Sequence, residues 1–327
     1  MPEPKVVVVG SINMDLVARS QRIPHAGETV IGGDFRTVPG GKGANQAVAA
    51  RRLGAQVCML GRVGMDPFGS QLLDNLSKAG VDATWVGRDP QAASGIALIM
   101  VDDAGQNSIL VAPGANMLLA PADMDAAEAV TPELLGVTPE LLGVTPELQG
   151  VIASAQVMLL QLEIPLETVV RAAQIGHAHG VKVVLNPAPA QPLPPELTHL
   201  VDVLVPNEFE AALLTGLPVD SDEQIRAAAS ALRASGAANV IITLGGRGSL
   251  LATAEGFQHF PAFPVKPVDT TAAGDAFVGC LGAALAEGRT LEEAVRWGSA
   301  AGALSTTKKG AQPSLPYRED VKALLGE

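Results

Sequence analysis

The residues best suited to chemistry lie in segment 269–275, where Asp-Thr-Thr-Ala-Ala-Gly-Asp runs into an apolar stretch. Small residues end at Gly274 and Asp275, just where a helix is expected to begin. The free N–H groups of a helix start, with no bulky side chains in the way, can bind a phosphate or a developing oxyanion. Asp275 would then face the bound anion as a candidate base. An ordinary helix with an aspartate in its first turn gives the same pattern.

A second Gly-rich loop, residues 40–45, leads into a helix that we expect to continue to Leu53. The loop is not a Walker A motif, because GxxxxGK followed by Ser or Thr is absent, and residues 10–12 do not supply a dinucleotide-binding GxGxxG. The glycines would let the backbone approach a small polar ligand closely, and Lys42 and Asn45 add hydrogen-bond donors. The alternative is a plain helix-entry loop.

Two short polar side chains, Asn13 and Asp15, follow the first predicted strand, residues 6–9. We expect both in a loop, residues 11–15, that leaves the end of this strand. An aspartate can accept hydrogen bonds from two hydroxyls, and an asparagine both donates and accepts, so the pair suits a polyol. Both residue types are also common turn formers.

Further carboxylates follow two other predicted strands: Glu210, with Asn207, comes after residues 203–205, and Glu163 comes after residues 157–160. Carboxylates at strand ends near a phosphate site can hold Mg²⁺ through water. As isolated acids, they would instead be solvated surface groups.

The remaining motifs indicate a function less specifically. Residues 243–248 form a Gly-rich turn after a strand, which suits nucleotide phosphates or simply a tight turn. His177 and His179 are two apart, so they do not share a helix face, and no histidine has zinc spacing. Cys58 and Cys280 have apolar neighbours, which favours small buried side chains over a metal site or a disulfide.

The elements that would position these groups alternate between apolar strands and Ala-rich stretches of helical period. This alternation predicts an α/β fold with a mostly parallel sheet covered by helices. In such sheets ligands bind beyond the carboxyl ends of the strands, which is where the motifs lie. The six expected strands are residues 6–9, 56–60, 157–160, 181–185, 203–205 and 240–244.

Two segments break this alternation, residues 28–38 and 95–111, and both have the pattern of antiparallel strands. Neither is long enough to form a domain. We therefore expect a small β-sheet lid, made of about residues 12–38 and 94–112, that covers a pocket near Asp15.

One internal repeat is present. Val-Thr-Pro-Glu-Leu-Leu-Gly occurs at residues 130–136, again at 137–143, and nearly again at 144–150. The seven-residue period suggests a coiled coil, but Thr-Pro-Glu starts a helix and Gly ends one, so each copy restarts a turn. We expect residues 130–150 to be a surface insertion in a single domain that spans residues 1–327.

The composition limits the possible partners. With 47% hydrophobic and 17% charged residues, the chain suits a compact enzyme and not a disordered one. Its net charge of −12 repels nucleic acid and anionic membranes, so an anionic ligand must be held locally. The N-terminus lacks a basic region followed by a longer apolar one, and no 18-residue apolar run follows. We expect a cytoplasmic protein without a membrane or nucleic-acid partner.

Five motifs, taken together and in this order, resemble the family of ribokinase-like carbohydrate kinases over nearly the whole chain: residues 10–16, 40–45, 207–210, 269–275 and 309–314. The resemblance implies a Rossmann-like sheet with a β lid that also forms a homodimer contact. It implies ATP-dependent phosphorylation of the 5-hydroxyl of D-ribose to give ribose 5-phosphate and ADP. It also implies Mg²⁺ and a monovalent cation activator, K⁺.

The resemblance assigns roles to individual residues. Asp275 would be the catalytic base, with the backbone of Ala272, Ala273 and Gly274 as the anion hole. The sugar would be bound by Asn13, Asp15, Gly41, Lys42, Asn45 and Glu163. ATP would be bound by Asn207, Thr243, Gly245, Gly246, Gly248, Gly274 and Ser299. Mg²⁺ would be held through water by Glu210, and K⁺ by Asp269, Thr271, Ser305, Lys308, Gly310 and Ser314.

One departure and two alternatives remain. The family carries an asparagine near the position of Ser299, so the departure concerns the adenine contacts. A kinase for another furanose or for a nucleoside is the nearest alternative, although a nucleobase pocket favours aromatic stacking and aromatics are 3% of the chain. A non-catalytic sugar or nucleotide sensor on the same fold is the other alternative, but Asp275, which a sensor could lose freely, is present.

Overall fold

The computed structural model of the chain describes residues 5–128 and 150–327. The predicted surface insertion therefore lies outside the described residues, except for Gly150. None of the helices within those two ranges is long and apolar enough to cross a membrane.

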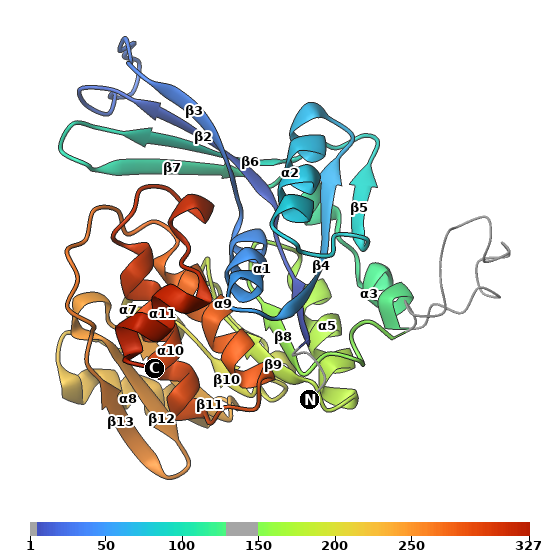
Figure 1. The fold of residues 1–327 in the computed structure, drawn as a ribbon, viewed down its shortest axis with the longest axis vertical. Helices are drawn as coiled ribbons and strands as arrows, with labels where there is room; N and C mark the ends of the chain where they lie inside the picture. Colours follow the sequence, from blue (N-terminus) through green and yellow to red (C-terminus); the bar gives the residue numbers. More distant parts are fainter. Residues whose placement is uncertain (1–4, 129–149) are drawn as a thin grey trace, which may run out of the picture.

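A nine-stranded sheet forms the centre of the molecule, in the order β13-β12-β11-β10-β9-β8-β1-β4-β5 (Figure 1). Neighbouring strands run parallel from β5 to β11, whereas β12 and β13 are added antiparallel at one edge. The predicted mostly parallel sheet is therefore confirmed. The strands are β1 (Lys5–Val9), β4 (Gln56–Gly64), β5 (Val86–Asp89), β8 (Val157–Leu160), β9 (Lys182–Leu185), β10 (Val203–Leu204), β11 (Asn239–Thr243), β12 (Ser249–Thr253) and β13 (Gly256–Phe260).

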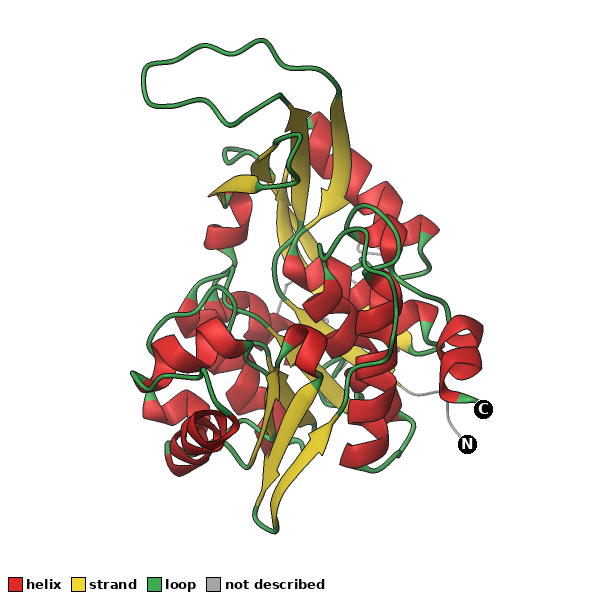
Figure 2. Ribbon diagram, turned by 90° about the vertical axis from the view of Figure 1, so that its left-hand side faces the viewer, coloured by secondary structure: helices red, strands yellow, loops and turns green. Residues whose placement is uncertain are grey.

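Helices cover both faces of this sheet, because its central strands are apolar on both sides (Figure 2). Val6 and Val8 of β1 point into one hydrophobic core, and Val7 and Val9 point into the other, as the alternation of side chains along a strand requires. The first core is covered by α1 (Lys42–Arg52), α2 (Pro67–Lys78), α9 (Ala273–Ala286), α10 (Leu291–Ser305) and α11 (Arg318–Leu325). The second is covered by α3 (Pro121–Glu128), α5 (Leu166–Ala178), α6 (Pro195–Thr198), α7 (Glu208–Thr215) and α8 (Asp222–Ala234).

A separate four-stranded sheet projects from the body at the top of Figure 1. We call it the lid sheet. It has the order β3-β2-β6-β7, and its strands are β2 (Asn13–Arg19), β3 (Phe35–Gly40), β6 (Gly95–Val101) and β7 (Asn107–Ala112).

The antiparallel strands expected in the lid are confirmed, since β3 pairs antiparallel with β2 and β6 with β7, while the central pair of β2 and β6 is parallel. Two details of the lid prediction were wrong. The strand expected from residue 28 begins only at Phe35, because the Gly32-Gly33 pair before it favours irregular backbone. Asn13 and Asp15 lie at the start of β2 and not in a loop, so strand pairing with β3 and β6 holds their backbone.

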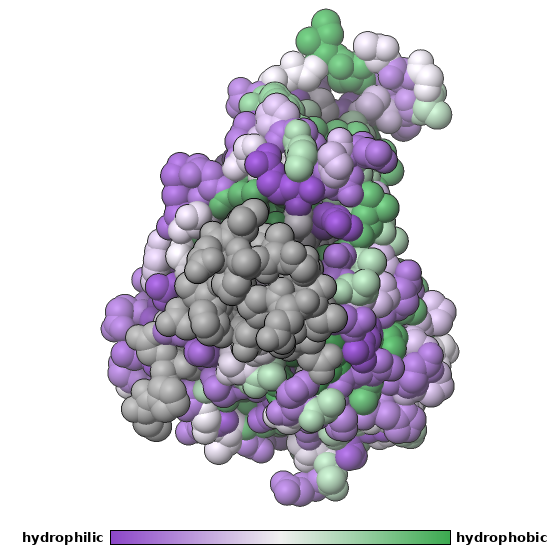
Figure 3. All heavy atoms as spheres, turned by 90° about the vertical axis from the view of Figure 1, so that its right-hand side faces the viewer, coloured by the Kyte–Doolittle hydropathy of each residue, from purple (hydrophilic) through white to green (hydrophobic). Residues whose placement is uncertain are grey.

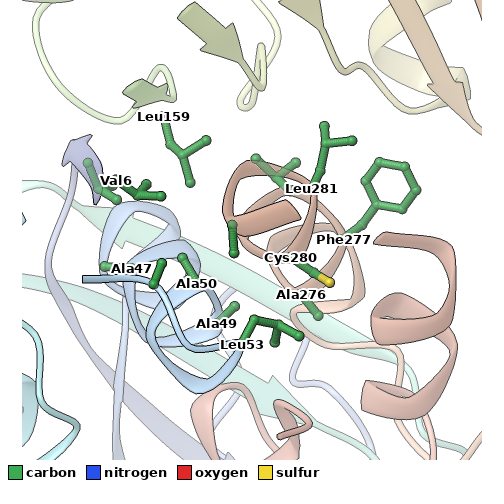
Figure 4. Close-up of a cluster of buried hydrophobic side chains, with 14 of the residues drawn as sticks. Val6, Ala47, Ala49, Ala50, Leu53, Leu159, Ala276, Phe277, Cys280 and Leu281 are labelled. Atoms are coloured by element: carbon green, nitrogen blue, oxygen red, sulfur yellow. The ribbon is translucent and has the colours of Figure 1, made fainter. Parts of the chain in front are cut away.

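Helices α1 and α9 pack side by side through small residues (Figure 4). A Cβ added at Gly279 of α9 would lie 2.5 Å from the Cβ of Ala49 in α1, so the two backbones approach as closely as glycine allows. Cys280 is buried in this contact, as expected, and Cys58 is half-buried; both are free thiols. The contact matters because the two helices begin at the two strongest motifs of the sequence.

Candidate active site

The first turn of α1 lies against the loop that follows β1. Gly41 has a φ of 89°, and a Cβ at Gly43 would lie 2.7 Å from the amide nitrogen of Ser11. Glycine is therefore required at both positions. The Ala44 amide donates a 2.9 Å hydrogen bond to the Ser11 carbonyl and locks the two segments together. The predicted helix through Leu53 is confirmed, since α1 ends at Arg52 and Leu53 is its C-cap.

Glu163 reaches this junction from the segment after β8. One of its oxygens accepts hydrogen bonds from the Ser11 hydroxyl, at 2.5 Å, and from the Lys42 amide, at 3.2 Å. The structure thus brings Glu163 together with the Gly-rich loop, and the carboxylate is a bound member of the site and not a solvated surface group. The role of Ser11 as a partner of Glu163 was not predicted.

Asp275 lies in the first turn of α9, as expected, and is 7% exposed. Asn45 Nδ2 donates to its Oδ2 at 2.9 Å, and Gln46 Nε2 donates to its Oδ1 at 3.2 Å. Burial raises the pKa of the Asp275 carboxyl, and the Lys42 ammonium and these two amides oppose that rise. Each partner is therefore one that favours the ionised carboxylate.

Lys42 brings a positive charge close to Asp275. Burial by itself would lower the pKa of its ammonium, but the nearby carboxylates Asp275, Glu163 and Glu210 outweigh burial and raise it. Lys42 therefore stays charged and offsets part of the negative charge that the three carboxylates bring together.

Asn13 and Asp15 lie on β2, at the base of the lid sheet. The side chain of Asn13 is fixed by Asn116, whose Nδ2 donates to Asn13 Oδ1 at 2.7 Å while its Oδ1 accepts from the Ile12 amide at 2.9 Å. Burial, then Glu163, then Asp275 raise the pKa of Asp15 from 3.8 to about 7. Asp15 is thus a carboxylate that changes charge near neutral pH in the free protein.

A cavity of about 220 Å³ opens at the start of α9. Ala272, with a φ of 60°, caps the helix, and the first bond of the helical ladder runs from the Ala276 amide to the Ala272 carbonyl at 2.8 Å. The Ala273 amide donates weakly to the Thr270 carbonyl at 3.3 Å, and a side chain at Gly274 would meet nothing within 4 Å. The cavity is lined by Lys42, Asn186, Ala188, Val205, Asn207, Glu210, Thr243, Thr270, Ala272, Ala273, Gly274, Asp275 and Val278.

The residues predicted to bind ATP lie in three places: at the cavity, in the Gly-rich turn after β11, and, for Ser299, on α10. Asn207 and Thr243 line the cavity and are bridged to each other by backbone pairing. Asn207 also caps α7 in a reciprocal capping box with Glu210, so the Asn-x-x-Glu pattern has a structural role as well. The turn of Gly245, Gly246 and Gly248 follows β11 but does not line the cavity.

Ser299 lies on α10 and is not among the lining residues of the cavity. Its hydroxyl oxygen is buried, and within the described part of the chain no hydrogen-bond partner reaches it. A ligand group could therefore satisfy it.

The residues predicted to hold K⁺ come from two segments that meet. Asp269 Oδ2 accepts from the Gly310 amide at 2.9 Å, and Asp269 Oδ1 accepts from the Thr271 amide at 3.0 Å. The Thr306 carbonyl accepts from the Asp269 amide at 3.1 Å. Ser305 and Ser314 each donate their hydroxyl to a backbone carbonyl at 2.8 Å, and Lys308 is exposed.

A second cavity, of about 320 Å³, separates the lid sheet from the body. Asp15, Val17 and Ile109 line it from the lid, and Thr270, Thr271 and Gly310 line it from the body. Asp15 and Thr270 therefore link this cavity to the first one, since Thr270 lines both and Asp15 is close enough to sense the charge of Asp275.

No group of three His, Cys, Asp or Glu side chains is placed to hold a metal ion within residues 5–128 and 150–327. A divalent cation would therefore need ligands from water or from a bound phosphate in addition to Glu210.

Four buried polar residues of the site were not predicted from the sequence, namely Gln46, Asn116, Gln161 and Asn186. The signal was present for two of them, because Gln161 and Asn186 directly follow the apolar strands β8 and β9, where ligand-proximal groups are expected. Gln46 had a weaker signal, a polar residue within an Ala-rich helix. Asn116 had none, because its function depends on a tertiary contact with Asn13.

Comparison with known proteins identifies close relatives. The family described as pfkB family carbohydrate kinase matches residues 3–318. The chain is 40% identical to ribokinase of Haemophilus influenzae and 40% identical to deoxyribokinase of Salmonella typhi, each over 98% of both chains. It is also similar to the structure of Arabidopsis thaliana ribokinase complexed with ribose and ATP, with 34% identity, a TM-score of 0.85 and 99% of both chains covered.

The charge state of Asp15 can be measured directly. In ligand-free protein, we expect the Asp15 carboxyl to titrate near pH 7 in a ¹³C NMR experiment, with Asp15→Asn assigning the signal. Glu163→Gln should move this titration to lower pH, because removing a neighbouring negative charge favours ionisation. A titration at the ordinary value of about 4, or one that Glu163→Gln leaves in place, would contradict the arrangement described above.

Proposed function

Because the chain belongs to the pfkB family of carbohydrate kinases, we propose that it transfers the γ-phosphoryl group of ATP to the 5-hydroxyl of D-ribose. The observation that carries the proposal is the position of Asp275, a buried carboxylate that lines the cavity at the start of α9. A single group there can meet a sugar hydroxyl on one side and a phosphoryl group on the other. The likeness to a ribokinase complexed with ribose and ATP supports this choice of substrates.

Asp275 acts as a base within the transition state. A carboxylate cannot ionise a sugar hydroxyl beforehand, because the two pKa values differ by roughly ten units. It accepts the proton as the bond from oxygen to phosphorus forms. Its hydrogen bonds to Asn45 and Gln46 hold both oxygens in place, so the proton acceptor does not have to reorganise during the reaction.

Negative charge that moves onto the phosphoryl oxygens is stabilised by the amides at the start of α9 and by Lys42. Ala272, Ala273 and Gly274 form the anion hole, in which the open space beside Gly274 admits the phosphoryl group. A bound Mg²⁺ would neutralise further negative charge on the phosphates. Glu210, which lines the same cavity, would hold that ion through water.

The sugar binds between the lid sheet and the body. Asn13, Asp15, Gly41, Lys42, Asn45 and Glu163 bind its hydroxyls. Asn45 Oδ1 is buried, and among the described residues it has no hydrogen-bond partner, so a sugar hydroxyl can satisfy it. The ionised form of Asp15 accepts hydrogen bonds from hydroxyls, whereas its protonated form accepts fewer.

The nucleotide lies on the other side of the anion hole. Asn207 and Thr243 contact its phosphates from within the cavity. Gly245, Gly246, Gly248 and Gly274 present backbone amides, and Ser299 satisfies its buried hydroxyl on the nucleotide.

2-Deoxyribose is the second candidate substrate, because the Salmonella typhi deoxyribokinase is as similar to the chain as the ribokinases are. The 5-hydroxyl is present in both sugars, so the same base and anion hole serve either reaction. The relative kcat/KM for the two sugars decides between them.

The lid sheet lines the proposed sugar site and also exposes apolar side chains at its edge. Its edge strand β7 exposes Ile109 and Leu110 at 54% and 64%, and Figure 3 shows exposed hydrophobic residues at the end of the molecule that carries the lid. An exposed apolar edge strand in water favours association. We propose that a second copy of the chain covers it, which makes the enzyme a homodimer.

A K⁺ site beside the anion hole would hold the loop that carries Ala272–Gly274. Main-chain and side-chain oxygens of Asp269, Thr271, Ser305, Lys308, Gly310 and Ser314 would bind the ion. The contact of Asp269 with Gly310 supports this site, because it joins the two segments that supply the ligands. The ammonium of Lys308 must point away from the ion, since two cations repel.

We also propose where in the cell the protein acts and which partners it does not bind. The two free thiols and the consumption of ATP favour a cytoplasmic location. The net charge of −12 disfavours nucleic acid or an anionic membrane as a partner.

The first experiment removes the base. We expect Asp275→Asn to lower kcat for ribose phosphorylation by at least about 10²-fold, because the amide keeps the shape of the side chain but cannot accept the proton. Calorimetric titration should show that ribose and ATP still bind. Asp74→Asn, on the exposed face of α2, is the matched control and should leave kcat unchanged. Near-normal turnover of Asp275→Asn would rule out the proposed base.

The second experiment tests K⁺ activation. In protein stripped of bound metal, K⁺ should raise activity well above that in a large organic cation at equal ionic strength. Asp269→Ala should weaken the response, because it removes the contact between the two ligand segments. Lys308→Ala should keep it, because only the backbone of Lys308 would bind the ion. Equal rates in both salts would mean that protein contacts alone hold the loop.

The third experiment tests the homodimer. Ile109→Lys combined with Leu110→Lys places charges on both faces of β7, and sedimentation analysis should then show a monomer where the unmodified protein is a dimer. Leu213→Lys, at a comparably exposed apolar position on α7, should leave the dimer intact. A monomeric unmodified protein, or a double variant that remains dimeric, would show that the lid is not the interface.

A further inference from the structure

We propose that Gln46 is a positioning residue, which aims the carboxylate of Asp275 through a chain of buried amides. We call this chain the amide relay; it consists of Gln161, Gln46 and Asn186. The inference rests on the proposed function, in which Asp275 is the base. It adds residues that act on that base without touching the substrate.

The relay joins three segments to α9, the helix that carries Asp275. These segments are α1, with Gln46, and the residues after β8 and β9, with Gln161 and Asn186. Gln46 Nε2, on α1, lies 3.2 Å from Asp275 Oδ1 and 3.2 Å from Asn186 Oδ1. Gln161 Nε2, after β8, donates to Gln46 Oε1 at 2.6 Å. Gln46 and Gln161 are both 0% exposed, so water does not compete for these hydrogen bonds.

The direction of every hydrogen bond in the relay follows from one backbone group. The Val205 carbonyl can only accept, and Asn186 Nδ2 donates to it at 2.9 Å. Asn186 must therefore turn Oδ1, an acceptor, towards Gln46. Gln46 in turn must present Nε2, and the second hydrogen of that nitrogen is directed at Asp275.

The opposite orientation of Gln46 is disfavoured at each contact. Its Oε1 would face the oxygens of both Asp275 and Asn186, and a buried pair of acceptors is costly. Gln161 completes the arrangement, because its Nε2 requires an acceptor on Gln46. Gly10 makes room for Gln161, since a Cβ at Gly10 would lie 1.9 Å from Gln161 Oε1.

Gln46 matters because the other groups around Asp275 have opposing effects on the pKa of its carboxyl. Lys42 and the amides of Asn45 and Gln46 favour its ionised form, whereas burial and Glu163 disfavour it. Asp15 and Glu210 also sense the charge of Asp275 and add to the negative charge of the site. Gln46 Nε2, as a donor of fixed orientation, holds Oδ1 of Asp275 in place. The remaining lone pairs of the carboxylate are then left for the sugar hydroxyl.

The first test replaces the donor. Gln46→Met keeps the length of the side chain, and we expect kcat to fall about ten- to a hundredfold, with little change in the KM for ribose or ATP. The acidic limb of the kcat profile should move to higher pH, because Asp275 loses a partner of its ionised form. Gln46→Glu should lower kcat further, since the introduced carboxylate faces two acceptors.

The second test asks whether Gln161 acts through Gln46. Gln161→Met should lower kcat by a smaller factor and in the same direction. Combined with Gln46→Met it should cause no further loss, because coupled residues are non-additive. Thr198→Val, which removes a 2.6 Å hydrogen bond from a buried hydroxyl of α6 to the Ser235 carbonyl at the C-terminal end of α8, is the control and should leave kcat and its pH profile unchanged.

A third readout does not depend on turnover. The Asp275 carboxyl, followed by ¹³C NMR in ligand-free protein, should titrate at higher pH in Gln46→Met than in the unmodified protein. If the unmodified protein fails to phosphorylate ribose, the proposed function fails and this titration still tests the relay. An unshifted titration, or additive losses for Gln46→Met and Gln161→Met, would overturn the inference.

Discussion

The proposed mechanism depends on one constraint, a carboxylate that is removed from water and yet has to stay ionised to accept a proton. Asp275 is buried at the start of α9, and burial alone would favour its neutral form. Three groups oppose this effect: the Lys42 ammonium and the amides of Asn45 and Gln46. All three come from α1. The close packing of α1 on α9, which the small residues at Gly279 and Ala49 permit, therefore holds Asp275 and its partners at fixed distances.

The same constraint has a cost in stability. Asp15 shares the site with Glu163 and Asp275, and burial, then Glu163, then Asp275 raise its pKa to about 7. A carboxyl whose pKa is higher in the folded than in the unfolded chain contributes stability at low pH. That contribution is lost as the pH rises from about 4 through the folded value of about 7. At neutral pH the protein therefore tolerates neighbouring carboxyl groups that disfavour each other's ionised form. A sugar with several hydroxyls can donate hydrogen bonds to them.

Much of this arrangement could be predicted from the sequence, for physical reasons that differ from element to element. The apolar runs gave the parallel sheet, because a strand buried on both faces must be apolar throughout, as residues 6–9 are. The helix start at Asp275 was recognisable from small residues before an apolar stretch. The parallel pairing of β2 with β6 was not predictable, since these strands are more than 70 residues apart and their pattern suits either direction. The proposed amide relay was also missed, because Gln46 of α1 meets its partners Gln161 and Asn186 only where they follow β8 and β9 in the folded chain.

Phosphorylation of the 5-hydroxyl of a free pentose is the reaction for which these residue roles are proposed. The most direct measurement is ³¹P NMR of the product formed from ATP and D-ribose. We expect ADP and one phosphomonoester, whose phosphorus couples to the two hydrogens on C5. A phosphorus coupled to a single anomeric hydrogen would contradict transfer to the 5-hydroxyl, as would inorganic phosphate without a sugar ester.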